Sequence, residues 1–249
     1  MIAKRFAAAT IMLGLVSAWG CDRLPGKPTE DERWVAPSQI ADFAQLYSQN
    51  CSGCHGTDGR LGAARPLNDP LYLSLLSPDN LRQIIKRGIP STTMPAFGQQ
   101  FGGSLTDAQV DLMVEQMRTR WGRPEEFKDV TLPPYSVQET ATGGPGPVPG
   151  DPQRGFAVYG VYCVQCHGAD GTGGAKGGSI VDPNFLRLVS DQSLRTTVIA
   201  GRQDIGKPDW RTNLPVRAMS PGEISDVVAW LAAQRPKAQS AEPGPDSKR

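Results

Sequence analysis

Two stretches of the chain place apolar residues with the spacing of a helix that buries one face. The positions are Val110, Met113, Val114 and Met117 in the first stretch, and Ile224, Val227, Val228 and Leu231 in the second. Each stretch follows a Ser or Thr that has Gln or Glu three residues later, the pairs Thr106/Gln109 and Ser220/Glu223. Such a pair forms a capping box, because the two side chains satisfy free N–H groups at a helix start. The pattern predicts two amphipathic helices with defined beginnings.

Another helix is expected near the start of each half of the chain. In the first half, Ile40, Phe43 and Tyr47 share one helical face. In the second half, Asp151 is a good helix cap that directly precedes a proline, and Tyr159 occupies the place of Tyr47. We expect both tyrosines to pack this helix against the last helix of its half.

The two halves are copies of one unit. The stretch CSGCHG at 51–56 recurs as CVQCHG at 163–168. The stretch DPLYLSLLSPDNLRQIIKRG at 69–88 then aligns without a gap with DPNFLRLVSDQSLRTTVIAG at 182–201. The alignment preserves the opening Asp-Pro pair, a central Leu-Arg pair and the final glycine. The chain therefore contains a duplicated domain.

The first residues have the pattern of an export signal. Lys4 and Arg5 precede an apolar run from Phe6 to Trp19, which at 14 residues is short for a bilayer span. An uncleaved anchor or a buried helix is the alternative interpretation of this run. Cys21, which follows it, lies outside the two repeated motifs, and an odd cysteine in an exported protein needs an explanation.

The stretch SAWGC at 17–21 resembles a bacterial lipoprotein signal. The resemblance implies that Cys21 becomes the lipidated N-terminus and that its acyl chains hold the protein at a membrane. Trp19 departs from the small or aliphatic residue usual in such signals, so cleavage after Ala18 is the alternative. Both interpretations predict a protein on the periplasmic side of a bacterial membrane.

These features set the expected boundaries. We expect a signal peptide over 1–20, an N-terminal tether over 21–36, one domain over 37–122 and a second domain over 150–235. The connection over 123–149 includes a Pro- and Gly-rich stretch without apolar periodicity and is expected to be an extended linker. The polar residues 236–249 are expected to form a disordered tail.

Composition narrows the class of function. With 26 basic and 25 acidic residues, the chain has no charge excess that would favour nucleic acid. Its only two histidines lie in the repeated motifs, which hold Cys51, Cys54 and His55, and Cys163, Cys166 and His167. No third histidine exists to serve as a general base or to join a motif histidine at one metal.

Cys-x-x-Cys-His is the attachment motif of c-type haem. On a helix, residues three apart share one face, so both sulfurs can reach one edge of the porphyrin while the next histidine binds the iron. A redox dithiol, a disulfide or half of a zinc site are the alternatives. Two such motifs in matching repeats of an exported chain favour two covalently bound haem c groups. The sixth ligands must be other residues, water or nothing.

With these motifs the sequence resembles the class I cytochrome c superfamily in a diheme arrangement, over nearly all of residues 37–235. The resemblance also rests on the terminal helices LTDAQVDLMVEQM and MSPGEISDVVAWL and on the loop STTMPAFG. It implies an all-α fold of two tandem domains, each a few helices wrapped around a covalent haem. In this family a Met-Pro pair after a glycine supplies the distal thioether, and Met94-Pro95, after Gly88, fits that pattern.

Lys207 occupies the place of Met94 in the second copy, again before a proline. A neutral amine can bind haem iron, and cytochromes with His/Lys ligation are known in this superfamily. Met219 is an alternative thioether, although the repeat places it opposite Leu105, where an apolar residue usually packs against the helix start. An open or water-bound iron is the third possibility. Because an amine favours ferric iron more than a thioether does, lysine ligation predicts that the second haem has the lower potential.

Other residues have expected supporting roles. Arg82 and Arg195, equivalent in the repeat, could pair with haem propionates or form structural ion pairs. Pro66 is expected to offer its carbonyl to the ring N–H of His55, and Ser179 lies near the matching place in the second copy.

The resemblance implies a membrane-tethered diheme cytochrome c that passes single electrons between redox proteins of a respiratory chain, from a quinol-oxidising complex to an oxidase or soluble cytochrome. Neither nucleic acid nor a small-molecule substrate is expected as a partner. The alternatives are a diheme enzyme, since Lys207 resembles the haem-ligating lysine of diheme thiosulfate dehydrogenases, and the cytochrome subunit of a dehydrogenase.

Overall fold

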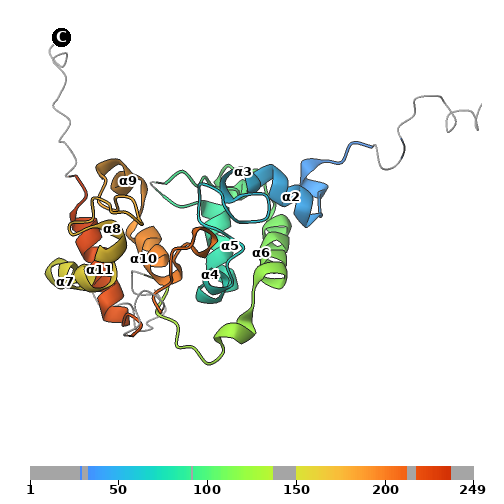
Figure 1. Cartoon of the computed structure of the whole chain (residues 1–249). Coiled ribbons are helices and arrows are strands. Elements are labelled where there is room, and N and C mark those ends of the chain that lie inside the picture. Colours follow the sequence, from blue (N-terminus) through green and yellow to red (C-terminus); the bar gives the residue numbers. More distant parts are fainter. Residues whose placement is uncertain (1–28, 30–32, 91, 137–149, 212–216, 237–249) are drawn as a thin grey trace, which may run out of the picture. The chain divides into compact units, whose positions relative to one another are not determined.

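The computed structural model describes residues 29, 33–90, 92–136, 150–211 and 217–236. Within these ranges the regular structure is entirely helical, and β pairing is limited to isolated bridges (Figure 1). The all-α prediction is confirmed. The residues up to Gln39 form one unit, in which Pro37–Gln39 is a 3-10 helix, η3, and the residues from Ile40 onward form a second compact unit.

The first copy of the repeat folds into five α-helices. In chain order, with the short 3-10 turn before the last of them, they are α2 (Phe43–Asn50), α3 (Ser52–His55), α4 (Pro70–Leu75), α5 (Pro78–Arg87), η4 (Gln99–Phe101) and α6 (Asp107–Trp121). A further 3-10 helix, η5 (Pro124–Phe127), follows.

The second copy repeats this order element for element. Its elements are α7 (Pro152–Tyr162), α8 (Val164–His167), α9 (Pro183–Leu188), α10 (Asp191–Ala200), η6 (Gln203–Ile205) and α11 (Pro221–Ala233). The same order of helices in both copies confirms that the repeat in the sequence is a repeat in the fold.

Matching caps start matching helices. Asp69 begins α4 and Asp182 begins α9, each accepting hydrogen bonds from two backbone N–H groups of the first turn. The predicted capping boxes at the starts of α6 and α11 are both present. Since a side-chain cap contributes about 1 kcal/mol, these polar residues fix where each helix begins.

The first helix of each copy packs against the last. α2 contacts α6, where Tyr47 and Trp121 meet edge to face with ring centroids 5.3 Å apart. α7 contacts α11, where Tyr159 and Trp230 lie 4.5 Å apart. The predicted packing role of the two tyrosines is confirmed. Where α7 crosses α11, a Cβ on Gly155 would lie 2.0 Å from a backbone oxygen of α11, so only glycine permits this approach.

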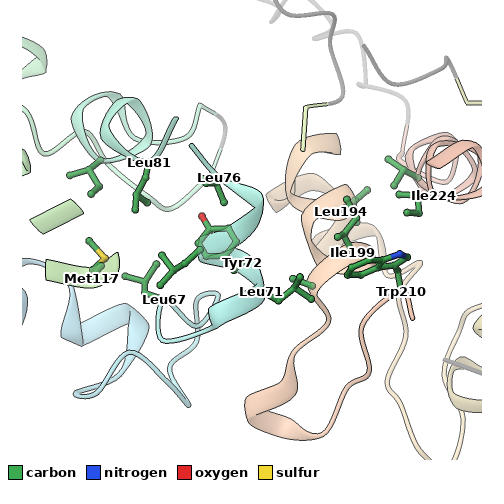
Figure 2. Packing of buried hydrophobic residues seen from close by; sticks show 14 of the residues in the cluster. Leu67, Leu71, Tyr72, Leu76, Leu81, Met117, Leu194, Ile199, Trp210 and Ile224 are labelled. Carbon is green, nitrogen blue, oxygen red and sulfur yellow. The ribbon is translucent and has the colours of Figure 1, made fainter. Parts of the chain in front are cut away.

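The apolar faces predicted for α6 and α11 are buried, and they belong to a core cluster to which both copies contribute. α4 of the first copy contacts α10 of the second. Figure 2 shows Leu71 of α4 directed towards Ile199 of α10, with Trp210 close by. The two domains therefore share buried apolar surface within one compact unit.

The connection between the domains differs from the extended linker expected over 123–149. Its first part contains η5, and Phe127, Leu132 and Tyr135 pack against the core. The Tyr135 carbonyl accepts a hydrogen bond of 2.7 Å from Gln192 of α10. The reason is that these residues include apolar side chains that gain stability by burial, unlike the Pro- and Gly-rich stretch that follows. That stretch, 137–149, lies outside the described residues.

Three further predictions also lie outside the described residues: the signal peptide over 1–20, lipidation at Cys21, and all but the first residue of the tail over 236–249. Among the residues that the structure does describe, no helix is both long enough and apolar enough to cross a membrane.

Candidate functional site

The two Cys-x-x-Cys-His motifs form matching one-turn helices. Cys51 ends α2 and also begins α3, and its carbonyl accepts a hydrogen bond of 3.0 Å from the His55 N–H. Cys163 and His167 repeat this bond at 3.0 Å. The four motif cysteines are free thiols, and one of them, Cys54, is exposed. Both thiols of each motif and the adjacent histidine thus lie on one turn, as attachment to one haem edge requires.

The acidity of the thiols argues against a redox dithiol. Burial raises the pKa of Cys51 and of Cys163 to about 12. The attacking cysteine of a redox dithiol instead has a lowered pKa. Within the described residues, no cluster of three metal-ligating side chains is present either. Two thiols and an adjacent histidine on one turn are the donor set that covalent haem attachment requires.

Both histidines are held with one ring nitrogen available. The Nδ1 atom of His55 lies 2.6 Å from the carbonyl oxygen of Arg65, and that of His167 lies 2.8 Å from the carbonyl oxygen of Gly178. A carbonyl only accepts hydrogen bonds, so Nδ1 carries the proton and Nε2 keeps its lone pair for iron. Burial lowers the pKa of His55, which favours the same neutral imidazole.

These contacts correct two expectations by one residue each. The carbonyl at His55 belongs to Arg65 rather than Pro66, and the one at His167 belongs to Gly178, next to Ser179. The path of the loop decides which carbonyl faces the ring, whatever the residue type. Beside His167 the loop is tight, since a Cβ on Gly177 would lie 2.9 Å from the imidazole Cε1.

A tyrosine hydroxyl ties the motif to the preceding helix in each copy. The Tyr47 hydroxyl donates a 2.8 Å hydrogen bond to the carbonyl of Gly56, directly after His55. Tyr159 donates the matching bond to Gly168. Sequence reasoning missed this role, although the equal spacing from tyrosine to motif in the two copies could have suggested it.

The loops that carry Met94 and Lys207 share a backbone hydrogen bond and a close glycine contact. The Met94 carbonyl accepts a 3.1 Å hydrogen bond from the N–H of Ile89, and the Lys207 carbonyl accepts one of 3.2 Å from Arg202, the equivalent residue. Gly88 packs against the Met94-Pro95 backbone as Gly201 packs against Lys207-Pro208. Lys207 thus stands at the structural position of Met94.

The side chain of Lys207 is partly buried and reaches the loop beside the second motif. Its Nζ donates a 2.7 Å hydrogen bond to the carbonyl of Lys176. The next residue, Gly177, lies beside the imidazole of His167, where an added Cβ would be 2.9 Å from Cε1. The lysine amine is therefore held beside the loop that carries Gly177 and Gly178 of the second domain.

Met219 occupies the place of Leu105. Its N–H donates to the Trp210 carbonyl at 3.1 Å, as that of Leu105 donates to Phe97 at 2.7 Å. Both side chains are buried, Met219 with 2% and Leu105 with 3% exposed, immediately before the cap of the last helix. This confirms the packing position that the repeat predicts for Met219.

The two equivalent arginines make different contacts. Arg82 bonds Asp79 and Asp111 in a surface ion-pair network. Arg195 is buried, and its Nε donates to the Pro134 carbonyl at 2.8 Å while Nη1 donates to the Ser225 hydroxyl at 3.2 Å. These contacts give Arg82 the structural role that was the alternative to a propionate contact, and they tie Arg195 to the connection between the domains.

Comparison with known proteins agrees with this site. The sequence model of the family described as cytochrome c oxidase, cbb3-type, subunit III matches residues 38–116 and 150–231. The two matched ranges coincide with the two copies of the repeat, and each contains one Cys-x-x-Cys-His motif.

Three curated proteins are similar to parts of the chain. The dihydro-heme d1 dehydrogenase of Pseudomonas aeruginosa is 44% identical over 80 residues, which is 32% of this chain and 15% of that protein. The cbb3-type cytochrome c oxidase subunit FixP of Sinorhizobium medicae is 25% identical over 164 residues, 64% of this chain and 50% of that protein. The subunit CcoP of Rhodobacter capsulatus is 31% identical over 83 residues, 31% of this chain and 28% of that protein.

The chain thus spans half or less of the length of these relatives. Among solved structures, a chain of the Kuenenia stuttgartiensis reducing HAO-like protein complex Kustc0457/Kustc0458 is similar with a TM-score of 0.43 and 15% identity. The likeness covers 82% of this chain and 100% of that chain. A TM-score this low carries no argument about function.

Proposed function

The chain belongs to the family of cbb3-type cytochrome c oxidase subunit III and is a class I c-type cytochrome with two covalently bound haems, and we propose that it is a membrane-tethered periplasmic carrier of single electrons. Its proposed partners are respiratory redox proteins: a quinol-oxidising complex on one side and an oxidase or soluble cytochrome on the other. Support comes from the relatives named as cbb3-type oxidase subunits. Redox encounters of this kind need only small, weak interfaces.

We assign the ligands from the geometry of the two copies. Cys51 and Cys54 would attach the first haem, and Cys163 and Cys166 the second. His55 and His167 would bind the irons through the Nε2 atoms that the loop carbonyls leave available. Met94 would be the distal ligand in the first domain and Lys207 in the second, with Met219 as the alternative. Each bound haem supplies reversible one-electron chemistry, and the chain sets its orientation and potential.

One observation carries the proposal: two structurally equivalent sites in one compact unit differ at the distal position. A carrier with two identical sites would hold two electrons at similar potentials. A thioether at Met94 raises the potential, whereas an amine at Lys207 stabilises the ferric state and lowers it. The second domain would then be the lower-potential centre, which gives the molecule a preferred direction of electron flow.

The function can be tested with the purified holoprotein. Membranes that contain a quinol-oxidising complex should reduce both haems, and membranes that contain an oxidase should reoxidise them, over many turnovers. The double variant Cys163→Ala/Cys166→Ala, which keeps the first motif intact, is the matched control. It should transfer electrons between the membranes more slowly than the wild type. Failure of both membrane preparations to exchange electrons with the wild-type protein would refute the carrier role. Turnover of thiosulfate by the protein alone would favour the enzyme alternative.

The tether is a separate part of the proposal. It rests on the resemblance of residues 17–21 to a lipoprotein signal. Mass spectrometry of the mature N-terminus is the test. A diacylglyceryl group on Cys21 is the expected result, and an unmodified Cys21 would refute lipid anchoring.

A second candidate function is the cytochrome subunit of a dehydrogenase. It is favoured by the 44% identity with part of a dihydro-heme d1 dehydrogenase. This function predicts that the protein copurifies with a large catalytic chain from its native membranes. Isolation without such a chain, together with the electron exchange described above, would favour the carrier.

A further inference from the structure

A loop of the first domain meets a loop of the second beside both motifs. Arg65 reaches from the first domain to α10, where its Nη2 donates a 2.8 Å hydrogen bond to the Thr197 hydroxyl. Its Nη1 lies at a longer 3.4 Å from the Gly201 carbonyl. The guanidinium also lies over the ring of Tyr72, 5.4 Å from the centroid. The aromatic ring of the first domain thus holds the arginine in the position from which it bonds the second.

The second domain contributes Asp204 to this contact. Its carboxylate accepts the N–H of Leu61 at 3.1 Å and two 2.9 Å bonds from Arg202, whose Nη2 also donates to the Gly62 carbonyl at 3.2 Å. The Asp204 side chain is 2% exposed, and its hydrogen bonds with Arg202 hold its pKa below the ordinary value. This is a buried, charge-assisted contact and therefore stronger than a surface ion pair.

The backbone at this contact is under strain. Leu61 has φ of 60°, the only positive φ of a non-glycine residue in the described part of the chain. Such a conformation is unfavourable for a residue with a Cβ and persists only where surrounding contacts enforce it. The bond from the Leu61 N–H to Asp204 is one such contact.

The same two loops hold one proposed ligand of each haem. The carbonyl of Arg65 binds Nδ1 of His55, the proximal ligand of the first haem. Arg202 is paired with Lys207 by two backbone hydrogen bonds, of 3.2 and 2.9 Å. A displacement of either loop would therefore alter the position of His55 in one domain and of Lys207 in the other.

The contact does not follow from the duplication. Gly178 is the equivalent of Arg65, since both carbonyls bind the motif histidine, and it has no side chain. Ile89 is the equivalent of Arg202 and has no charge. Arg65 in the first domain and Arg202 in the second therefore have no charged equivalent in the other copy.

We propose that Arg65 and Asp204 are positioning residues that couple the proximal ligand of the first haem to the lysine ligand of the second. The proposal rests on the assignment of Lys207 in the proposed function. Coupling of this kind is reciprocal, so a change at the Arg65 loop shifts the lysine equilibrium at the second haem, and a change at Asp204 shifts the first haem. The two redox centres then respond to each other rather than titrating independently.

The test uses ferric holoprotein with both haems. Imidazole competes with Lys207 for the second iron, and its apparent affinity reports how firmly the lysine is held. We expect Arg65→Met to raise that affinity about tenfold, because it removes a charged hydrogen bond that fixes the loop. Arg120→Met is the matched control: Arg120 lies over Phe43 at 5.0 Å in the same domain and is expected to change the affinity less than about twofold.

Two further variants guard against misfolding and test reciprocity. Thr197→Val keeps the shape of the side chain but removes the hydroxyl, which accepts from Arg65 and donates to the Ser193 carbonyl within α10, and it should act in the same direction more weakly. Asp204→Asn should shift the midpoint potential of the first haem by up to about 59 mV, the value of a tenfold change for one electron. Circular dichroism of each variant verifies that the helices are retained.

Lys207→Ala distinguishes a failure of the lysine assignment from a failure of the coupling through Arg65 and Asp204. If Lys207→Ala leaves the spectrum of the second haem unchanged, the lysine assignment fails and the coupling falls with it. If Lys207→Ala changes that spectrum but Arg65→Met and Thr197→Val behave like Arg120→Met, the proposed function stands and the coupling alone is refuted.

Discussion

The distal loop of the second domain depends on one glycine, and replacing it gives a sharp prediction. Gly201 has φ of +65°, and a Cβ at this position would lie 2.3 Å from the Pro208 oxygen and 2.6 Å from the Lys207 oxygen. These are backbone atoms, so they cannot rotate away as a side chain would. Gly201→Ala should therefore displace the Lys207-Pro208 segment.

The same loop supplies the control. Gly206 also has positive φ, +73°, but a Cβ there would meet nothing within 4 Å. Alanine costs about 1–2 kcal/mol at Gly206, whose backbone is left-handed helical with φ 73° and ψ 19°. Gly201, with φ 65° and ψ −157°, lies in a region that is essentially restricted to glycine, where alanine costs about 1–3 kcal/mol. Only Gly201→Ala adds the clash, which as overpacking costs about another 1–3 kcal/mol. The difference between the two variants therefore combines the contact with the lysine segment and the distinct backbone conformation of Gly201.

Two measurements on the holoprotein compare Gly201→Ala with Gly206→Ala. Urea unfolding should show Gly201→Ala less stable than Gly206→Ala by about 1–3 kcal/mol at similar m values. The ferric spectrum of the second haem should change in Gly201→Ala and stay as in the wild type in Gly206→Ala. Equal losses of stability and equal spectra would refute the argument that Gly201 supports the distal loop.

Three other results are expected. Tyr159→Phe removes the bond to the Gly168 carbonyl and should lower the free energy of unfolding by about 1 kcal/mol in urea, with the packing against α11 retained. Met219→Leu should cost less than about 1.5 kcal/mol and leave the spectrum of the second haem unchanged, because Met219 fills a core position. The hydrogen bonds with Arg217 lower the pKa of Glu223 from 4.5 to about 2, so its stabilisation is complete above pH 4.5 and is lost as pH falls towards 2. Glu223→Gln should abolish that part of the pH dependence, which we expect to be about 1 kcal/mol because the partner arginine is largely exposed, and thermal unfolding across this pH range measures it.

The fold could be predicted largely because the sequence contains two copies of the same domain. Helix caps such as Ser220 and apolar faces such as that of α11 are local signals, and the second copy confirmed each element of the first. The equivalence of Lys207 and Met94 also followed from the alignment alone, and the backbone hydrogen bonds of the two loops bear it out. Local pattern and repetition together were sufficient for this level of description.

The contacts that depend on loop path could not be predicted. The carbonyl that faces His55 belongs to Arg65 and not to Pro66, because the orientation of a peptide unit is set by the whole loop. The contact of Asp204 with Leu61 joins residues 143 positions apart, and the positive φ of Leu61 has no signal in its residue type. Interactions of such separation are fixed by how the domains pack, which no local pattern encodes.

The central claim is that two equivalent haem sites in one chain differ in their distal ligand. A spectroelectrochemical titration of the holoprotein, following each haem and the weak thioether-to-ferric-iron band, tests it most directly. We predict two separated potentials and complete loss of that band in Met94→Ala, with Lys207 on the second haem. A band that survives Met94→Ala and disappears only when Met219 is also replaced would contradict the claim, because both haems would then have thioether ligands.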